Sequence, residues 1–209
     1  MIKTTIPYAE TGYFSALICD YLQRKETLEA FYHRYPSLEN ASEQFKEKTK
    51  KYSSTTREQL VASLQKQYVG LPTSEATKKN ISALAESNTF TVTTGHQLNL
   101  FTGPLYFLYK IFSAINLAES LRQKYPEYAF VPVYWMATED HDFDEINHFR
   151  LHGKNFAWNK AGVEDNDKGA VGHFDTEGLQ AVYEQFCSEL GSGILRSDPG
   201  VMIDSRGTT

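Results

Sequence analysis

The sequence predicts an α/β fold whose parallel sheet follows a helical N-terminal region. A β-rich segment, 90–94, and an apolar segment, 131–136, flank an apolar stretch long enough for one helix. Strand, helix and strand in this order form a βαβ unit, and its strands are expected to be parallel with a right-handed crossover. Residues 1–87 read mainly as helices, so we predict a helical region over 1–87 and a partial α/β core over 88–209.

Helical spacing and helix-boundary residues set the expected helices of the first region. We predict helices over 15–24, 39–51, 55–68 and 75–86. Ser74 is expected to cap the last of these helices, because a serine hydroxyl accepts hydrogen bonds from free backbone N–H groups. Neither a glycine-rich loop nor an acid pair is found in this region, so packing against the core is its expected role.

The elements of the core follow in order. The long helix is expected to run to Lys124, with Pro104 in its first turn and Thr102 or Gly103 as its cap. Pro132 lacks a backbone donor, so the second strand is expected to pair only after it. Beyond this unit we predict strands over 147–158 and 171–174, and then a helix over 177–190 that is capped by Thr176 and ended by Gly191.

Composition limits the class of protein. The chain has 209 residues and a net charge of −5, which suits one large domain, or a domain with an appendage, and argues against a general nucleic-acid binder. Cys19 and Cys187 have no metal or redox spacing, and no apolar run reaches signal-peptide or membrane-spanning length. These features favour a cytoplasmic protein without nucleic-acid or membrane partners.

The end of the sequence is abrupt. Residues 198–204 read as a loop entering a strand, and the chain stops five residues later. We therefore expect a truncated chain, with a frayed native tail as the alternative.

A polar loop follows the first predicted strand. Gly95 is expected to make a sharp exit from the strand, and His96 and Gln97 supply donors and acceptors. The next helix directs free N–H groups towards the same place, so an anionic group could bind there. The candidate binding residues are Thr94, Gly95, His96, Gln97, Asn99, Thr102, Gly103 and Pro104. A turn whose polar side chains only cap backbone groups is the alternative.

An acidic loop follows the second predicted strand. Its candidate catalytic residues are Glu139, Asp140, His141 and Asp142, and Asp144 and Glu145 extend the run. Crowded carboxylates are expected to raise some of their pKa values, which would suit a general acid or base. Carboxylates with a histidine could also hold Mg²⁺. A solvated acidic loop that caps the following helix is the alternative.

The carboxyl ends of neighbouring parallel strands lie at one edge of a sheet, where ligands bind in open α/β folds. The two loops are therefore expected to meet in one site.

The two loops together resemble a known family. TTGHQLNLFTGPLYFLYKIFSAINLAESL and VPVYWMATEDHDFDEINHF are similar to the corresponding segments of the cysteine-adding enzymes of bacillithiol biosynthesis, the BshC family. His96 stands where many members carry a second glutamine. The resemblance covers nearly all of this chain, and about the first half of a typical member.

The resemblance implies a Rossmann-like core and a ligase that adds cysteine to glucosaminyl malate. It permits ATP and Mg²⁺ as cofactors without requiring either, because the loop at Gly95 lacks the second histidine of the full nucleotide-binding signature. It also implies that full-length members form homodimers through a C-terminal coiled coil that is absent here. A nucleotidyltransferase-like enzyme on the same core, or an inactive truncated or binding module, are the alternative functions.

Overall fold

A computed structural model of the chain describes residues 4–159 and 169–191. The chain divides into two compact units, residues 1–53 and residues 54–209. The predicted boundary between residues 87 and 88 falls inside the second unit, so the helical pair before the sheet belongs to the same unit as the sheet. The predicted strand entry at 198–204 lies outside the described residues.

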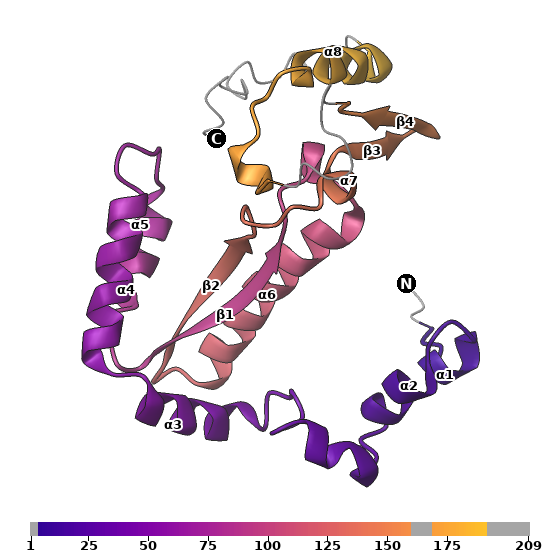
Figure 1. The fold of residues 1–209 in the computed structure, drawn as a ribbon. Helices are drawn as coiled ribbons and strands as arrows, with labels where there is room; N and C mark the ends of the chain where they lie inside the picture. The colour runs from indigo at the N-terminus through magenta and orange to yellow at the C-terminus, as the bar shows by residue number, and fades with distance from the viewer. Residues whose placement is uncertain (1–3, 160–168, 192–209) are drawn as a thin grey trace. The chain divides into compact units, whose positions relative to one another are not determined.

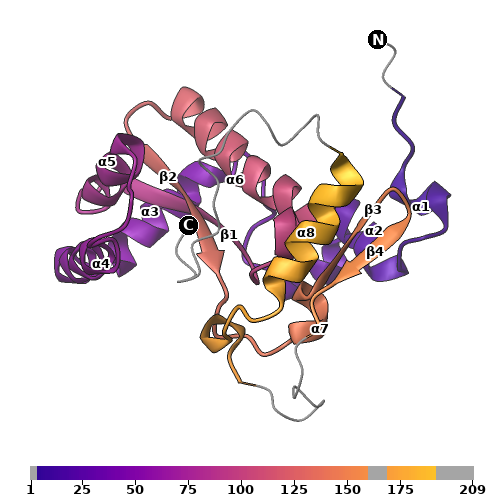
Figure 2. The same ribbon diagram turned by 90° about the horizontal axis from the view of Figure 1, so that it is seen from above.

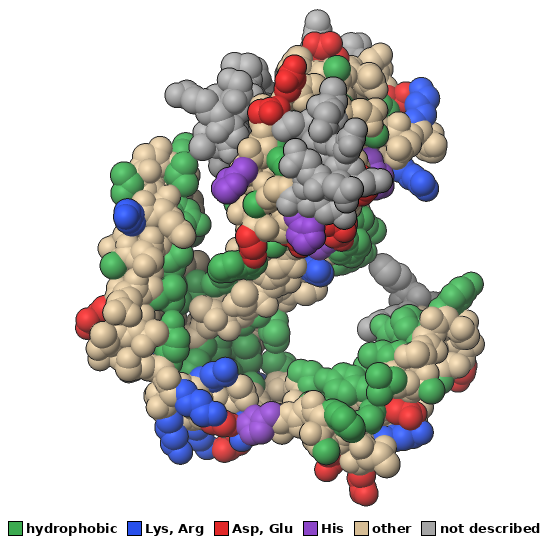
Figure 3. Space-filling model, viewed as in Figure 1, with side chains coloured by type: hydrophobic (Ala, Val, Ile, Leu, Met, Phe, Trp, Pro, Cys, Tyr) green, Lys and Arg blue, Asp and Glu red, His purple; other side chains and the backbone are tan. Residues whose placement is uncertain are grey.

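The first unit consists of short helices. They are α1 (Tyr8–Thr11), α2 (Ala16–Leu22), the 3₁₀ helix η1 (Glu26–Phe31) and α3 (Ala41–Lys51). Ser15 caps α2, since its Oγ accepts from the Ile18 N–H at 3.4 Å. None of the residues of α1, α2 and η1 is buried, and hydrophobic side chains cover much of this unit's surface (Figure 3).

The second unit begins with a helical pair, α4 (Ser54–Gln67) and α5 (Glu75–Ala83). The predicted Ser74 cap is confirmed, because its Oγ accepts from the Thr77 N–H at 3.2 Å. Arg57 of α4 is buried, and its guanidinium donates to the Leu84 carbonyl at 3.1 Å and the Thr89 carbonyl at 3.0 Å. This arginine therefore ties α4 to the segment that leads into the sheet.

The predicted βαβ unit is confirmed. Strands β1 (Thr89–His96) and β2 (Ala129–Met136) are parallel, and α6 (Leu105–Lys124) connects them and packs along both (Figures 1 and 2). The register pairs Thr89 with Ala129 and His96 with Met136. Both strands therefore end at the same level, and the loops that follow them start side by side.

Two expectations about the strands are wrong. The first strand does not stop before Gly95 but continues through His96, because Gly95 and His96 still pair with β2. Pro132 lies within the ladder opposite Val92. In the described part of the chain β2 has β1 as its single neighbour, and proline is tolerated in a strand that has an open edge.

The segment after the acidic loop is a hairpin and not the predicted single strand. After the short helix α7 (Phe143–Ile146), β3 (His148–Leu151) and β4 (Lys154–Ala157) pair antiparallel. His152 and Gly153 between them have φ values of 49° and 78°. A two-residue turn with positive φ at both positions joins antiparallel strands directly, and the alternation of apolar residues alone did not reveal it.

The last described elements also differ from the prediction. The expected strand over 171–174 is the 3₁₀ helix η3 (Val171–His173), whose Val171 N–H donates to the Asp140 carbonyl at 2.8 Å. Helix α8 (Leu179–Leu190) ends at Gly191 as predicted, but Gly178 occupies its N-cap position in place of Thr176.

The buried core of this region contains Phe156, Trp158 and Val182. These residues come from β4, the segment that follows it, and α8, so the hairpin and the last helix share one core. Across residues 4–159 and 169–191, none of the helices, α6 included, combines the length and the apolar character that crossing a membrane requires.

Candidate active site

Gly95 serves strand packing and does not make the predicted sharp exit. A Cβ on Gly95 would lie 3.0 Å from the Trp135 carbonyl oxygen and 3.1 Å from its Cβ. The absence of a side chain thus permits the close approach of β1 to β2. The sharp reversal comes later, in the 3₁₀ helix η2 (Leu100–Thr102), where Phe101 has a φ of 46°, and at Gly103, which has a φ of 53°.

The start of α6 also differs from the expectation. Pro104 occupies the N-cap position, with no side-chain capping bond, so neither Thr102 nor Gly103 caps this helix. Gly103 instead gives space to Asn99, because a Cβ on Gly103 would lie 2.6 Å from the Asn99 Cβ. The Asn99 side chain therefore packs directly against the backbone of Gly103, where the chain reverses.

Two groups contact His96 Nδ1. Asn99 Nδ2, which can only donate, is 2.9 Å away, and the Gln97 carbonyl oxygen, which can only accept, is 3.3 Å away. Asn99 Nδ2 also donates to the Gln97 carbonyl at 3.0 Å. A ring nitrogen that accepts a hydrogen bond carries no proton, so the shorter contact favours the neutral ring with its proton on Nε2. His96 Nε2 lies 2.7 Å from Tyr106 Oη, and it donates to that oxygen.

The two loops are joined through Glu145, at the end of the acidic run. Gln97 Nε2 donates to Glu145 Oε2 at 2.9 Å, and Tyr106 Oη donates to Glu145 Oε1 at 3.2 Å. His96 Nε2 is 3.4 Å from the same Oε1. Gln97 is only 6% exposed, and both its Oε1 and the Asn99 Oδ1 are buried without a hydrogen-bond partner. The loops after β1 and β2 thus meet in one hydrogen-bonded cluster.

Tyr106 stays protonated in this cluster. Burial, the hydrogen bond to Glu145 and the negative charge of Glu145 all raise the pKa of the Tyr106 phenol above its ordinary value. A second tyrosine also bonds to this loop, because Tyr134 Oη of β2 donates to the His96 carbonyl at 3.0 Å. Burial raises the pKa of Tyr134 as well.

The predicted catalytic residues of the acidic loop have local partners. Asp140 Oδ1 accepts from the backbone N–H groups of His141 at 2.6 Å and Asp142 at 3.2 Å. Asp142 caps α7 by accepting from the Glu145 N–H at 3.1 Å. Glu139 accepts from the indole of Trp135 at 3.2 Å, and the His141 side chain is 64% exposed.

The expected rise in carboxyl pKa is wrong for Asp140. The backbone N–H groups of Asp142 and His141, together with the Gln97 amide, hold the pKa of Asp140 below its ordinary value. Hydrogen bonds to the charged form therefore outweigh the desolvation that opposes them.

Two residues of this cluster were missed by sequence reasoning alone. Tyr106 belongs to an apolar helix and has no motif of its own, and Tyr134 reads as a strand residue. Glu145 was part of the acidic run but not among the four candidates. Its place just after the Asp142 cap was the available signal, because a capped helix turns its first side chains back towards the preceding loop.

An open groove of about 400 Å³ adjoins the cluster. Thr94, Tyr106 and Lys110 are among its lining residues. Lys110 Nζ donates to the Gly95 carbonyl at 3.2 Å and lies 5.5 Å from the centre of the Tyr106 ring. The groove at the carboxyl end of β1 is therefore lined by the hydroxyl-bearing Thr94, the cationic Lys110 and the Tyr106 side chain.

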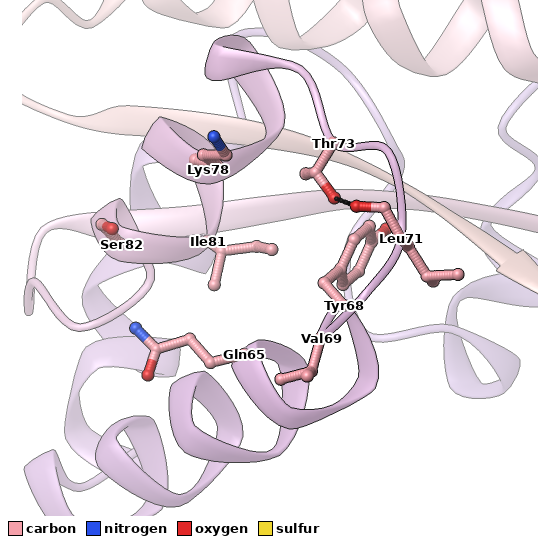
Figure 4. Close-up of a pocket in the computed structure, with 8 residues that line it drawn as sticks. All are labelled: Gln65, Tyr68, Val69, Leu71, Thr73, Lys78, Ile81 and Ser82. Carbon is pink, nitrogen blue, oxygen red and sulfur yellow. Dashed lines mark hydrogen bonds between the residues drawn. The ribbon is translucent and has the colours of Figure 1, made fainter.

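A second pocket, of about 370 Å³, lies between α4 and α5 (Figure 4). Its walls are mainly apolar, and the one cation among its lining residues, Lys78, is paired with Glu75 at 2.7 Å. None of the predicted site residues lines it, so it contributes nothing to the candidate site.

The start of α6 offers hydrogen-bond donors and a cation to an anionic group. Within the described ranges, no three His, Cys, Asp or Glu side chains converge closely enough to hold a metal. The first N–H groups of α6, at Leu105 and Tyr106, have no partner within a helix by geometry, and they carry the positive end of its dipole. Lys110 lies one turn further along the same helix.

A parallel βαβ unit with polar loops at the carboxyl ends of both strands defines a Rossmann-like α/β domain. The family model for "Bacillithiol biosynthesis BshC, N-terminal Rossmann-like domain" matches residues 1–201. The chain therefore belongs to the BshC family.

Curated relatives carry the name "Putative cysteine ligase BshC". The protein from Christiangramia forsetii is 57% identical over 193 residues, which cover 92% of this chain and 36% of the relative. Those from Flavobacterium johnsoniae and Flavobacterium psychrophilum are 55% and 53% identical, over 90% and 89% of this chain and 34% of each relative. The chain thus spans about a third of the length of these relatives.

Proposed function

We propose that this chain carries the acceptor site of a ligase that adds cysteine to glucosaminyl malate in bacillithiol biosynthesis. Membership of the BshC family and the names of the relatives support the reaction class. The observation that carries the proposal is the hydrogen-bonded joining of the two polar loops, in which Gln97 and His96 of the first contact Glu145 of the second. An assembled cluster of this kind suits acid–base chemistry.

The reaction requires two events. An amide bond forms when the neutral acceptor amine attacks the carbonyl carbon of an activated cysteine. The activating group leaves with the bonding electrons, and the nitrogen gives up a further proton, which the departing group can take up. The amine must first lose a proton, since its ammonium form has no lone pair for the attack.

The first loop and the start of α6 are proposed to hold the anionic part of the reactants. The free N–H groups at the start of α6 and the ammonium of Lys110 favour a negative charge. Thr94 lines the same groove. The loop around this position is formed by the other predicted binding residues, which are Gly95, His96, Gln97, Asn99, Thr102, Gly103 and Pro104.

The acidic loop is proposed to orient the amine. Its carboxylates attract a positively charged ammonium group before the proton leaves. Glu139, Asp140, His141 and Asp142 remain the candidates for this role. Asp140 and Asp142 act by holding the loop backbone, whereas His141 extends from it.

The test is cysteine addition by the purified chain. Cysteine and glucosaminyl malate are supplied with and without ATP and Mg²⁺, and the amide product is detected by mass spectrometry. The full-length Christiangramia forsetii relative serves as a positive control for the substrates. We expect product from the wild-type chain, about 100-fold less from His141→Ala, and wild-type levels from His148→Ala, another exposed histidine.

Two results would overturn the proposal. One is no product from folded chain under conditions in which the relative is active. The other is release of pyrophosphate from ATP with a substrate that has no amine, which would indicate a nucleotidyltransferase.

A further inference from the structure

We propose that Glu145 is the group that takes the proton from the acceptor amine, and that it does so through the hydroxyl of Tyr106. This inference rests on the proposed function and names a proton acceptor outside the four predicted catalytic residues. Three contacts define the path: His96 Nε2 to Tyr106 Oη at 2.7 Å, Tyr106 Oη to Glu145 Oε1 at 3.2 Å, and Gln97 Nε2 to Glu145 Oε2 at 2.9 Å.

The direction of each hydrogen bond is assigned from the shorter of two contacts at His96 Nδ1, which are Asn99 Nδ2 at 2.9 Å and the Gln97 carbonyl oxygen at 3.3 Å. With Asn99 Nδ2 as the donor, the ring proton is on Nε2 and is donated to the Tyr106 oxygen. The Tyr106 hydroxyl is then left to donate to Glu145 Oε1. His96 has no nitrogen free to accept a proton in this arrangement, so it acts as a positioning residue for Tyr106.

Glu145 keeps one oxygen for the reaction. The buried Gln97 amide holds Oε2, while Oε1 faces the Tyr106 hydroxyl. The Glu145 side chain is 41% exposed and Tyr106 is 42% exposed, and Tyr106 lines the open groove beside the cluster. A substrate in that groove can therefore contact the Tyr106 side chain, whereas Glu145 is not among the residues that line the groove.

The proton transfer balances. The ammonium proton of the acceptor passes to the Tyr106 oxygen as the hydroxyl proton of Tyr106 passes to Glu145 Oε1. The amine becomes neutral and nucleophilic, Glu145 becomes a neutral carboxylic acid, and Tyr106 ends as the phenol it was before. The raised pKa of Tyr106 agrees with a group that hands on a proton without remaining ionised.

The first arm of the test needs no turnover. Tyrosine labelled with ¹³C at Cζ is titrated by NMR in the wild-type chain and in Glu145→Gln. Loss of the carboxylate should move the Tyr106 titration down towards the ordinary pKa of tyrosine. Tyr134 is an internal control that should not move, since burial alone raises its pKa. An unchanged Tyr106 titration would overturn the relay.

The second arm measures cysteine addition. Glu145→Gln and Tyr106→Phe should each lower kcat by about 100-fold or more, with little change in KM for the acceptor. Glu119→Gln, which removes an exposed carboxylate of α6 outside both loops, should keep the wild-type rate. His96→Gln should retain most of the rate, because an amide can still donate to Tyr106, and His96→Leu should not.

The outcomes separate the two proposals. Wild-type turnover with an undiminished rate in Glu145→Gln would overturn the relay and leave the ligase function in place. Absence of turnover in the wild-type chain would overturn the proposed function, and with it the relay that rests on it.

Discussion

Replacing Gly103 by alanine should destabilise the chain through two separate effects. Gly103 has φ 53° and ψ −146°, a region that only glycine adopts readily, and a side chain there costs about 1–3 kcal/mol. The new methyl group would also lie 2.6 Å from Asn99 Cβ. Overpacking of this kind costs about 1–3 kcal/mol, so the free energy of unfolding should fall by about 2–6 kcal/mol.

Two other glycines separate these effects. Gly153 has a φ of 78° and open space around its Cβ position, so Gly153→Ala tests backbone strain alone, at about 1–2 kcal/mol. Gly172 lacks a positive φ, but its Cβ would lie 2.7 Å from Thr138 Cβ, so Gly172→Ala tests crowding alone, at about 1–3 kcal/mol.

Urea denaturation followed by circular dichroism gives the free energy of unfolding of each variant. Gly103→Ala should be the least stable of the three. It should also change the ring ¹⁵N signals of His96, because Asn99 holds His96 Nδ1. A loss no larger than that of Gly153→Ala would refute the contribution of Asn99 crowding.

Three further predictions test the fold and the loop. Arg57→Met should lower the free energy of unfolding by about 3 kcal/mol or more, and Arg57→Lys by less, because the guanidinium satisfies buried carbonyl groups. Phe156→Ala should cost about 3–5 kcal/mol in the same urea assay, whereas the exposed Phe31→Ala should cost nothing measurable. The lowered pKa of Asp140 means that its charged form adds stability above the unfolded carboxyl pKa of about 3.9, and that this stability is lost as the pH falls through the folded pKa. Asp140→Asn should remove that part of the acid dependence of Tm, and an identical pH profile would contradict it.

The local pattern of the sequence was sufficient for the longer helices and for the parallel unit. Ser74 caps α5 as predicted, and α6 ends at Lys124 as predicted, because caps and apolar periodicity act within a few residues of the chain. The pairing of β1 with β2 also followed from order alone, since a long helix between two strands makes them parallel.

Contacts between distant segments decided what the sequence pattern missed. Residues 171–173 form a 3₁₀ helix because their backbone donors bond the acidic loop at Asp140 and Thr138. The strand-like composition of this segment carried no information about that partner. Similarly, the hairpin turn at His152 and Gly153 depends on positive φ values, which the apolar alternation does not encode.

The sequence by itself determined that polar loops follow two parallel strands, and therefore that they lie at one edge of the sheet. Only the tertiary structure decided which side chains meet there. Glu145 lies 39 residues from Tyr106 and 48 residues from Gln97, and its contacts with them depend on the strand register and on the turn of α7. Short-range chemistry specifies the longer helices and the order of the strands, whereas side-chain hydrogen bonds between the loops form only after packing has brought the loops together.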